Sequence, residues 1–460
     1  MFIKLTPKSR INFIVFLFTI LVEIICCIGT ANVIYDLICT FSFILFFVFF
    51  LYQDTIFFIK YINVLVGIVG TACGVIICEE MKIYLSELGV YSSHFGSLPL
   101  LELFFTIKFF SLYISDRQTE SILAPGKKKI DSINRCIYMI LKPLIFLGGL
   151  LVFSFVFTKP CFMYRMDRFQ YAQAYLNNFG IEKLANLIVF FSPVLIIPFF
   201  RGRDINLKNV ISELFIPLIP VLLFYIWIGH KFGIFFRIIC YYIVPLSCKI
   251  KLNRNAKKMA IKILISIGVF LFLLLFLFYT FTARIDMWSA IFRRIAMQGQ
   301  LWWKIYGIYE NQAPRYFEIL DEITHIFVPG PDYNHGIYKL MYLTTPRSIV
   351  NTKLATGSRY SASGLELPFY YFKEPGVVFV AIFVAFIYSQ LTNAIIKSAK
   401  NLNCIDLMIF QHILVMFQAA SSQGDWEAFW SVKMLIFIIA LIVSHLMYRN
   451  NKMCNQLCRK

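Results

Sequence analysis

The chain of 460 residues is too apolar for a soluble protein: 59% of its residues are hydrophobic, 15% are charged, and the mean hydropathy is +0.72. An average soluble domain is about 45–50% apolar and about 25% charged, so a lipid bilayer must solvate much of this chain. The net charge of +19 requires no nucleic-acid partner, because Lys and Arg gather in the cytoplasmic loops of membrane proteins.

Apolar runs follow one another along most of the chain. A helix needs about 20 apolar residues to cross ~30 Å of hydrocarbon. The sequence therefore predicts an all-α, polytopic membrane protein with about 12 transmembrane helices, or about 10 if the Pro- and Arg-interrupted stretch 213–247 contains no crossing pair. The predicted crossings lie near 11–30, 34–53, 61–78, 98–115, 143–158, 184–200, 213–230, 234–247, 263–282, 376–396, 405–423 and 427–447.

Basic residues predict the orientation of these crossings. With both termini inside, the inner segments hold 25 Lys and Arg and the outer segments hold 16, although the outer segments are longer in total. This asymmetry favours cytoplasmic termini. The expected organisation is nine helices with short loops over 1–282, one large outer loop over 283–375, and three helices with a cytoplasmic tail over 376–460.

The outer loop 283–375 is the main departure from a plain helical bundle. A loop this long is usually functional or disordered, and its many aromatic residues argue against disorder. Within it, residues 288–309 have helical spacing of aromatic side chains, which predicts an amphipathic helix at the membrane surface. Sugar stacking on Trp302 or Trp303 is a sharper interpretation of the same pattern.

Arginines in the outer loop are candidates for binding a diphosphate, because the guanidinium fork matches phosphate oxygens. The alternative is contact with lipid headgroups or ion pairing with nearby acidic residues such as Glu310, Glu318, Asp321 and Glu322. The candidate diphosphate-binding residues are Arg284, Arg293, Arg294, Arg347 and Arg359.

A proton acceptor is also expected on the outer side if a sugar hydroxyl is activated there. The preferred candidates are Glu366 and His335, and the turn 423–427 between the last two crossings is expected to approach the long loop. The remaining candidates are His325, Asp425 and Glu427.

Several familiar motifs are missing from the sequence. It contains no P-loop, no Gly-rich dinucleotide turn, no His-Glu-x-x-His helix and no Gly-x-Ser-x-Gly elbow. The cytoplasmic segments are too short for a nucleotide-sugar domain. We therefore expect no cofactor and no metal, and a donor that arrives already activated in the membrane.

In its topology, and in residues 293–303 (RRIAMQGQLWW) and 357–364 (GSRYSASG), the chain resembles the Wzy-type O-antigen polymerases. Some members carry an Arg-x10-Gly motif in two outer loops. Here the corresponding spacing is eleven residues between Arg168 and Gly180 and nine between Arg347 and Gly357.

The resemblance implies a glycosyltransferase of the bacterial inner membrane with a periplasmic active face. Such an enzyme polymerises undecaprenyl-diphosphate-linked oligosaccharide repeat units for lipopolysaccharide and has no nucleic-acid partner. Its expected partners are these lipid-linked glycans, membrane lipids and a chain-length regulator in the membrane. An O-antigen ligase, a polysaccharide flippase or transporter, and a membrane scaffold are the alternatives.

Overall fold

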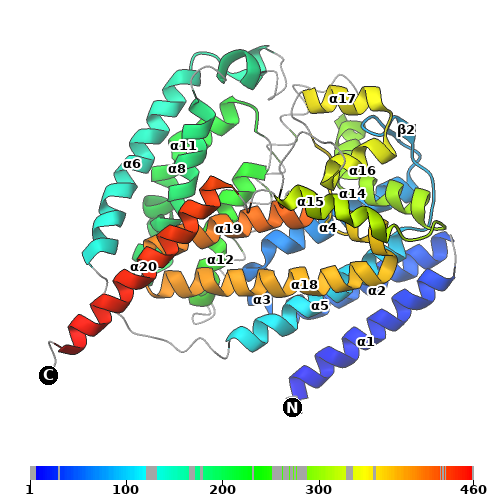
Figure 1. Cartoon of the computed structure of the whole chain (residues 1–460), viewed down its shortest axis with the longest axis horizontal. Helices are drawn as coiled ribbons and strands as arrows, with labels where there is room; N and C mark the ends of the chain where they lie inside the picture. The colour runs from blue at the N-terminus through cyan, green and yellow to red at the C-terminus, as the bar shows by residue number, and fades with distance from the viewer. Residues whose placement is uncertain are drawn as a thin grey trace. The chain divides into compact units, whose positions relative to one another are not determined.

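The computed structural model describes residues 7–29, 32–120, 132–164, 171–176, 180–230, 233–250, 287–327, 335–355, 359–424 and 431–457, together with isolated positions between 262 and 276 and between 426 and 429. The described residues are almost entirely helical, as the sequence predicts, apart from one two-stranded hairpin (Figure 1). They divide into two compact units. Unit 1 comprises 1–121, 283–390 and 419–425, and unit 2 comprises 122–282, 391–418 and 426–460.

Among the described residues, nine helices are long and apolar enough to cross a membrane. The protein is therefore a multi-pass membrane protein, with fewer described spans than the predicted twelve. The nine spans cover Arg10–Ile28, Val33–Gln53, Ile62–Glu80, Leu98–Gln118, Asn134–Val156, Ile181–Phe200, Lys208–Trp227, Glu366–Lys400 and Cys404–Gln423.

Three predicted crossings are not among the nine. The segment 263–282 lies almost entirely outside the described residues. The segment 234–247 is helical within α12 (Gly233–Ile250), but the apolar stretch between Arg237 and Lys249 is too short to cross ~30 Å at 1.5 Å per residue. The last, 427–447, corresponds to α20 (Val432–Leu457), whose apolar part covers only Val432–Ser444.

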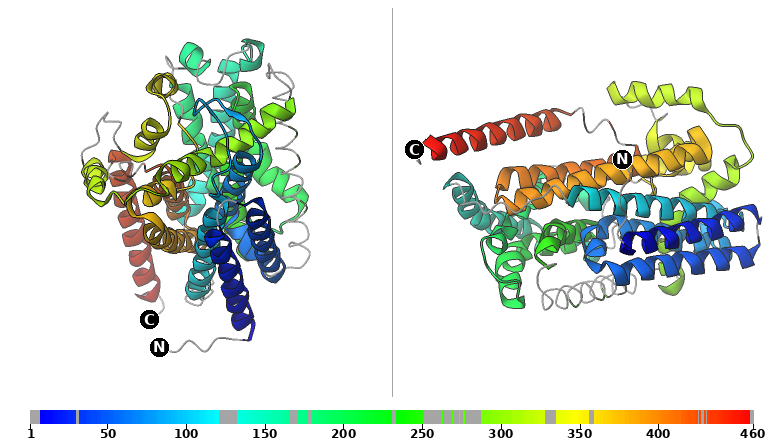
Figure 2. Two further views of the ribbon diagram at one scale, coloured as in Figure 1. Left: turned by 90° about the vertical axis from the view of Figure 1, so that its right-hand side faces the viewer. Right: turned by 90° about the horizontal axis from the view of Figure 1, so that it is seen from below.

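Unit 1 begins with helices that run alongside one another, α1 (Pro7–Ile28), α2 (Val33–Gln53) and α5 (Leu98–Glu120) (Figure 2). Polar side chains within these spans are paired: Thr106 donates to Glu23 at 2.7 Å, and Thr40 donates to Glu102 at 3.0 Å. Such pairing reduces the cost of polar groups in a bilayer. The remaining early elements are α3 (Thr55–Lys60), α4 (Ile62–Glu80), β1 (Tyr84–Leu85) and β2 (Val90–Tyr91).

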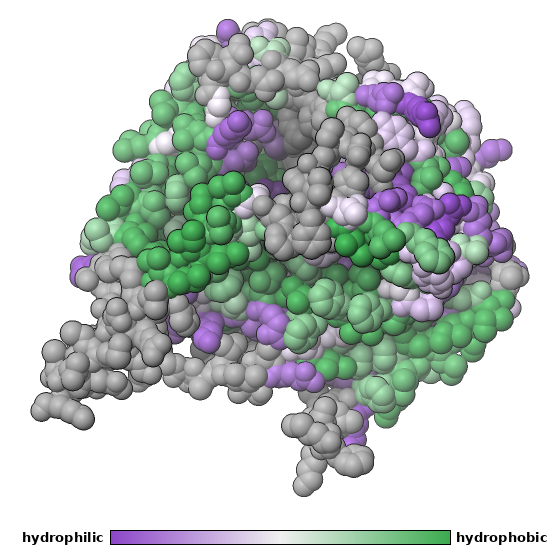
Figure 3. Space-filling model, in the orientation of Figure 1, coloured by the Kyte–Doolittle hydropathy of each residue, from purple (hydrophilic) through white to green (hydrophobic). Residues whose placement is uncertain are grey.

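The predicted outer loop folds into helices in unit 1, in agreement with the expectation that it is ordered. These are α14 (Met287–Tyr309), α15 (Ile319–Phe327), α16 (Gly336–Thr344) and α17 (Arg347–Ala355), with a 3-10 turn at Tyr316–Glu318. Hydrophilic side chains gather over this part of unit 1, whereas hydrophobic side chains cover α1 (Figure 3). This contrast is expected when α1 faces lipid and α17 faces water, whereas α15 and the turn before it expose Phe317, Leu320 and Ile323.

Helix α14 packs directly against α4 through two glycines. A Cβ atom on Gly74 or on Gly299 would collide with the backbone of the other helix. Small residues allow such close approach between helices in membranes. Trp288 near the start of α14 is 53% exposed, but the later aromatic residues of α14 are buried in protein, and its position at the membrane surface stays a prediction.

Helix α18 (Glu366–Lys400) begins in unit 1 and contains a sharp bend. Lys373 has a φ of 58°, a left-handed value that is rare for a residue with a side chain, and Pro375 follows it. The Lys373 ammonium donates to the Tyr309 carbonyl, which fixes the bend against the end of α14. The predicted crossing 376–396 is the part of α18 that follows the bend.

Unit 2 is a second helical bundle. Its longest members are α6 (Ser132–Val156), α11 (Ile216–Trp227), α12, α20 and most of α19 (Cys404–Gln423). Its shorter elements are the turns at Cys161–Tyr164, Ala172–Leu176, Ser192–Ile196 and Ile211–Phe215, and the helices α8 (Ile181–Phe191), α9 (Ile197–Phe200) and α10 (Leu207–Val210).

Candidate functional site

Two of the predicted site residues, His335 and Arg359, meet at one aromatic ring in unit 1. His335 precedes the first turn of α16, and its ring packs edge-on against Tyr338 with centroids 5.7 Å apart. Arg359 lies in the extended segment before α18, and its guanidinium lies 4.6 Å from the centre of the same Tyr338 ring. His335 is buried and Arg359 is exposed. We refer to His335, Tyr338 and Arg359 as the Tyr338 cluster.

The end of α19 packs against the two segments that carry this cluster. A Cβ on Gly336 would lie 2.9 Å from the Gln423 carbonyl oxygen, and a Cβ on Gly364 would collide with the Ser421 carbonyl. Gly336 and Gly364 have φ values of 54° and 84°, which suit glycine. The prediction that the turn after α19 approaches the long loop is confirmed by these contacts.

Six basic residues of the outer segment fall into two groups. Those in the first group are held by carboxylates: Arg315 and Lys339 contact Glu318 at 3.0 and 2.7 Å, and Lys353 contacts Glu87 at 3.0 Å. These contacts agree with the alternative interpretation of the charge as internal ion pairs.

The second group contains Arg293, Arg294 and Arg347. Within the described part of the chain, no carboxylate lies within 4.0 Å of their guanidinium groups. Arg294 and Arg347 are exposed, and Arg293 is partly exposed. Guanidinium groups in this state are available to an anionic ligand. Arg284 lies outside the described residues.

Glu318 holds two members of the first group, Arg315 and Lys339, and we call these three residues the Glu318 cluster. Burial raises the pKa of this carboxyl, but hydrogen bonds from Lys339, Tyr370 and Arg315 outweigh that effect and lower the pKa to about 2. Arg315 also lies over the rings of Tyr309 and Tyr370, at 5.4 and 5.6 Å. The cluster ties the turn after α14 to α16 and to the start of α18.

Glu366, the other predicted proton acceptor, caps its own helix. Its carboxylate accepts the backbone N–H groups of Ser363, at 2.9 and 3.0 Å, and of Leu365, at 3.0 Å. The Ser363-x-x-Glu366 spacing is that of a capping box, and the side chain is buried. The two carboxylate oxygens of Glu366 therefore already accept three backbone hydrogen bonds. The side chain of His325, and residues Asp425 and Glu427, lie outside the described residues.

Trp302 and Trp303 are buried within unit 1. The Trp302 indole N–H donates to the Ser97 carbonyl at 3.2 Å, and that of Trp303 donates to the Ser93 carbonyl at 2.7 Å. Trp303 also stacks on Phe95, with ring centroids 4.8 Å apart. In this structure the two indoles attach α14 to the loop before α5, and sugar contact by them stays a prediction.

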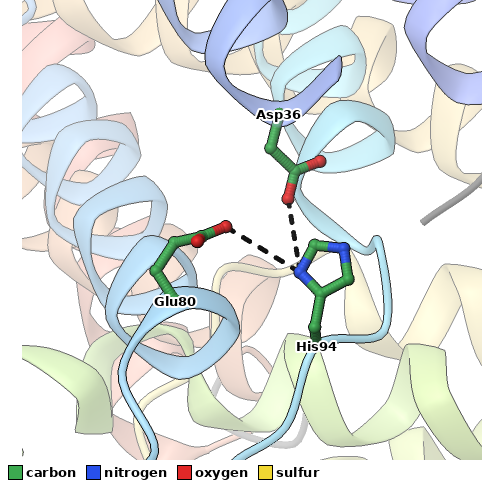
Figure 4. A group of neighbouring side chains, drawn as sticks. All are labelled: Asp36, Glu80 and His94. Carbon is green, nitrogen blue, oxygen red and sulfur yellow. Dashed lines mark ion pairs between the residues drawn. The ribbon is translucent and has the colours of Figure 1, made fainter. Parts of the chain in front are cut away.

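The sequence interpretation missed Tyr338, which joins His335 to Arg359. Tyr338 lies in the first turn of α16, three residues after His335. The sequence interpretation also missed a group with the spacing of metal ligands in unit 1: Asp36, Glu80 and His94 offer ligand atoms within 4.8 Å of one another (Figure 4).

Comparison with known proteins gives one match. Residues 330–438 match a family described as "Family of unknown function (DUF6418)". This range includes His335, Tyr338 and Arg359, together with α16, α17, α18 and α19. No curated protein and no solved structure matches the chain.

Proposed function

We propose that the protein is a glycosyltransferase that polymerises lipid-diphosphate-linked oligosaccharide repeat units at the outer face of the bacterial inner membrane. The observation that carries the proposal is the Tyr338 cluster, in which an exposed guanidinium and an imidazole flank one aromatic ring. In this proposal Arg359 serves as the phosphate-binding group, His335 as the proton acceptor and the Tyr338 ring as a surface for a sugar. The wider resemblance to Wzy-type polymerases supports the same function.

In the proposed reaction, Arg359 binds the diphosphate of the donor. Arg347, Arg293 and Arg294 add positive charge on the same outer segment. Bidentate contacts from arginine stabilise the charge that develops on the departing phosphate oxygen. The bond between the donor sugar's anomeric carbon and this oxygen breaks. The polyprenyl diphosphate then leaves with both electrons of that bond.

His335 takes the proton from the acceptor hydroxyl as the new glycosidic bond forms. Histidine is the side chain that most often serves as a general base, because a neutral imidazole nitrogen accepts a proton directly. Both substrates are held in the membrane by their lipid chains, which restricts their relative orientation and supplies part of the rate. No nucleotide takes part, since the diphosphate ester already activates the donor.

Deletion of the gene tests this function in the cell. A polymerase mutant should still attach one repeat unit to its surface acceptor, so that gels of the surface glycolipid show core plus one unit and no ladder. Core without any unit would instead indicate a ligase or a flippase. An unchanged ladder would exclude the protein from this process.

A purified assay tests the chemistry. The detergent-solubilised protein, given a synthetic polyprenyl-diphosphate-linked repeat unit, should release polyprenyl diphosphate and form longer glycans. Arg135→Ala is a suitable control, because Arg135 is exposed and lies on α6, in a segment predicted to be cytoplasmic. This variant should retain full activity.

A further inference from the structure

Four ionisable side chains meet at one end of α2 and α4 in unit 1, away from the Tyr338 cluster. Asp36 lies in the first turn of α2, and Glu79 and Glu80 are the last two residues of α4. His94 lies in the loop that leads to α5 and directs its ring between Asp36 and Glu80 (Figure 4).

The distances in this group approach those between ligands of a metal ion. His94 Nδ1 lies 3.7 Å from Asp36 Oδ2, 3.8 Å from Glu80 Oε1 and 3.4 Å from Glu79 Oε2. A tetrahedral ion with bonds of about 2.1 Å has edges of about 3.4 Å between its ligand atoms. His94 therefore lies within a few tenths of an ångström of the ligand spacing both to Asp36 and to Glu80, and all three ligand atoms lie within 4.8 Å of one another.

The charge of the group is unbalanced. Among the described residues, the one basic group within 4.0 Å of these three carboxylates is His94, so that even an imidazolium leaves a net negative charge. Glu79 and Glu80 also lie at the C-terminal end of α4, where the helix dipole disfavours anions. A cation between the carboxylates would remove both penalties.

Atoms that point into the group lack hydrogen bonds. Asp36 is only 4% exposed, yet its Oδ2 has no hydrogen-bond partner, and neither ring nitrogen of His94 has one. A buried carboxylate oxygen and a buried imidazole nitrogen without partners are costly. Both atom types are good ligands for divalent transition metals.

Glu79 has a different task. It accepts hydrogen bonds from the backbone N–H groups of Phe95, Gly96 and Ser97 and from the Ser97 hydroxyl. Its carboxylate thereby fixes the loop that presents His94, so we treat Glu79 as a positioning residue and not as a ligand.

We propose that Asp36, Glu80 and His94 bind a divalent transition-metal ion of the Zn²⁺ or Mn²⁺ type. The Glu80 side chain is 34% exposed, so one side of the site is open to water, which completes the coordination shell. The imidazole nitrogen selects against Mg²⁺ and Ca²⁺, which prefer oxygen ligands. This site is independent of the glycosyl transfer proposed above.

The ion would act as a clamp. The loop that carries His94 also contacts α14, because the Ser97 and Ser93 carbonyls accept hydrogen bonds from the Trp302 and Trp303 indoles. Metal binding would join α2, α4 and this loop, and would thereby stabilise the surface on which α14 is seated.

The full-length purified protein, stripped with a chelator and then titrated with Zn²⁺ or Mn²⁺, tests the site directly. We expect one ion per chain and a saturable rise in melting temperature, with at most weak competition from Mg²⁺. Absence of saturable binding would overturn the proposal. Equal competition by Mg²⁺ would overturn the assignment of His94 as a ligand.

Variants separate this site from adventitious binding. Asp36→Asn, Glu80→Gln and His94→Gln should each weaken metal affinity by at least about 100-fold, since loss of even an outer-shell partner costs 10–100-fold. Glu374→Gln is the control, because Glu374 is an exposed carboxylate elsewhere in unit 1, and it should bind as the wild type does. Wild-type affinity in all three site variants would refute the proposal.

The chelated state supplies a readout that does not depend on bound metal. In chelator, Asp36→Asn and Glu80→Gln should melt at the same temperature as the wild type or higher, because each removes one of the crowded negative charges. With metal, the wild type should melt highest. A purely structural ion-pair cluster would instead make both variants less stable in chelator.

Discussion

The Glu318 cluster and the Tyr338 cluster are built from neighbouring segments of unit 1, yet they use positive charge in opposite ways. In the Glu318 cluster, Arg315 and Lys339 are both held by one carboxylate. In the Tyr338 cluster, Arg359 lies exposed over an aromatic ring beside an imidazole. The difference teaches that a basic outer segment is not one uniform surface: Arg315 and Lys339 are tied to a carboxylate, whereas Arg359 is exposed beside an aromatic ring.

Both clusters can meet the proposed substrates only if they lie on the outer face of the membrane. The test of membrane orientation therefore has the largest expected effect. The distribution of Lys and Arg predicts cytoplasmic termini and an outer segment over 283–375. Alkaline phosphatase fused after Tyr333 should be active, and the same enzyme fused after Arg254 should be inactive. The reverse pattern would place both clusters in the cytoplasm and remove the proposed substrates.

Replacement of Arg359, in the Tyr338 cluster, should lower the polymerisation activity. Arg359→Ala should reduce polymerisation about 100-fold or more, the range found when one donor to a developing oxyanion is removed. Arg359→Lys should restore little, because lysine lacks the bidentate fork. Glycan chain length on gels measures polymerisation, and an immunoblot measures the protein level.

The matched control for Arg359→Ala is a variant in the Glu318 cluster. Arg315→Ala should lower stability while leaving the activity of each folded molecule near that of the wild type, since Arg315 is tied to Glu318. If Arg359→Ala were fully active, headgroup contact would explain the exposed arginines better.

The sequence predicts the helices better than it predicts their contacts. Apolar runs locate α1, α2, α4 and α5 to within a few residues, because bilayer thickness fixes the length of a span. Helical period also shows that the aromatic residues of α14 share a face. It does not show whether that face meets lipid or protein, so the burial of Trp302 and Trp303 could not be predicted.

The candidate site shows the same limit. His335 and Arg359 were identified by residue chemistry, but their shared contact with Tyr338 depends on the packing of α16 against the segment before α18. The local bonds of Glu366, in contrast, follow the Ser-x-x-Glu spacing: its carboxylate reaches back to the Ser363 backbone N–H, and that local pattern competes with any catalytic assignment. The ligands at positions 36, 80 and 94 have no sequence spacing that indicates a metal site.

A smaller effect is expected where α14, which leads into both clusters, crosses α4. Gly299→Val should destabilise unit 1 by about 1–3 kcal/mol, the usual cost of overpacking, or by more if the backbones cannot separate. Gly70→Val is the control, because a Cβ on Gly70 meets nothing within 4 Å. Melting of the purified variants measures the difference, and equal melting temperatures would argue against the close crossing.

The smallest effect is expected from Glu318 itself, and it depends on pH. The folded pKa of about 2 lies below the ordinary value of about 4.3, so ionised Glu318 stabilises the fold above pH ~4.3, and this contribution is lost as the pH falls toward 2. Its side chain is about one-third exposed, so solvent screening limits the contribution to roughly 1 kcal/mol. Glu318→Gln should therefore melt lower than the wild type at pH 6, and the difference should shrink as the pH falls below 4. A difference that stayed constant with pH would show that Glu318 acts through its hydrogen bonds alone, and that the Glu318 cluster does not neutralise Arg315 and Lys339 as we infer.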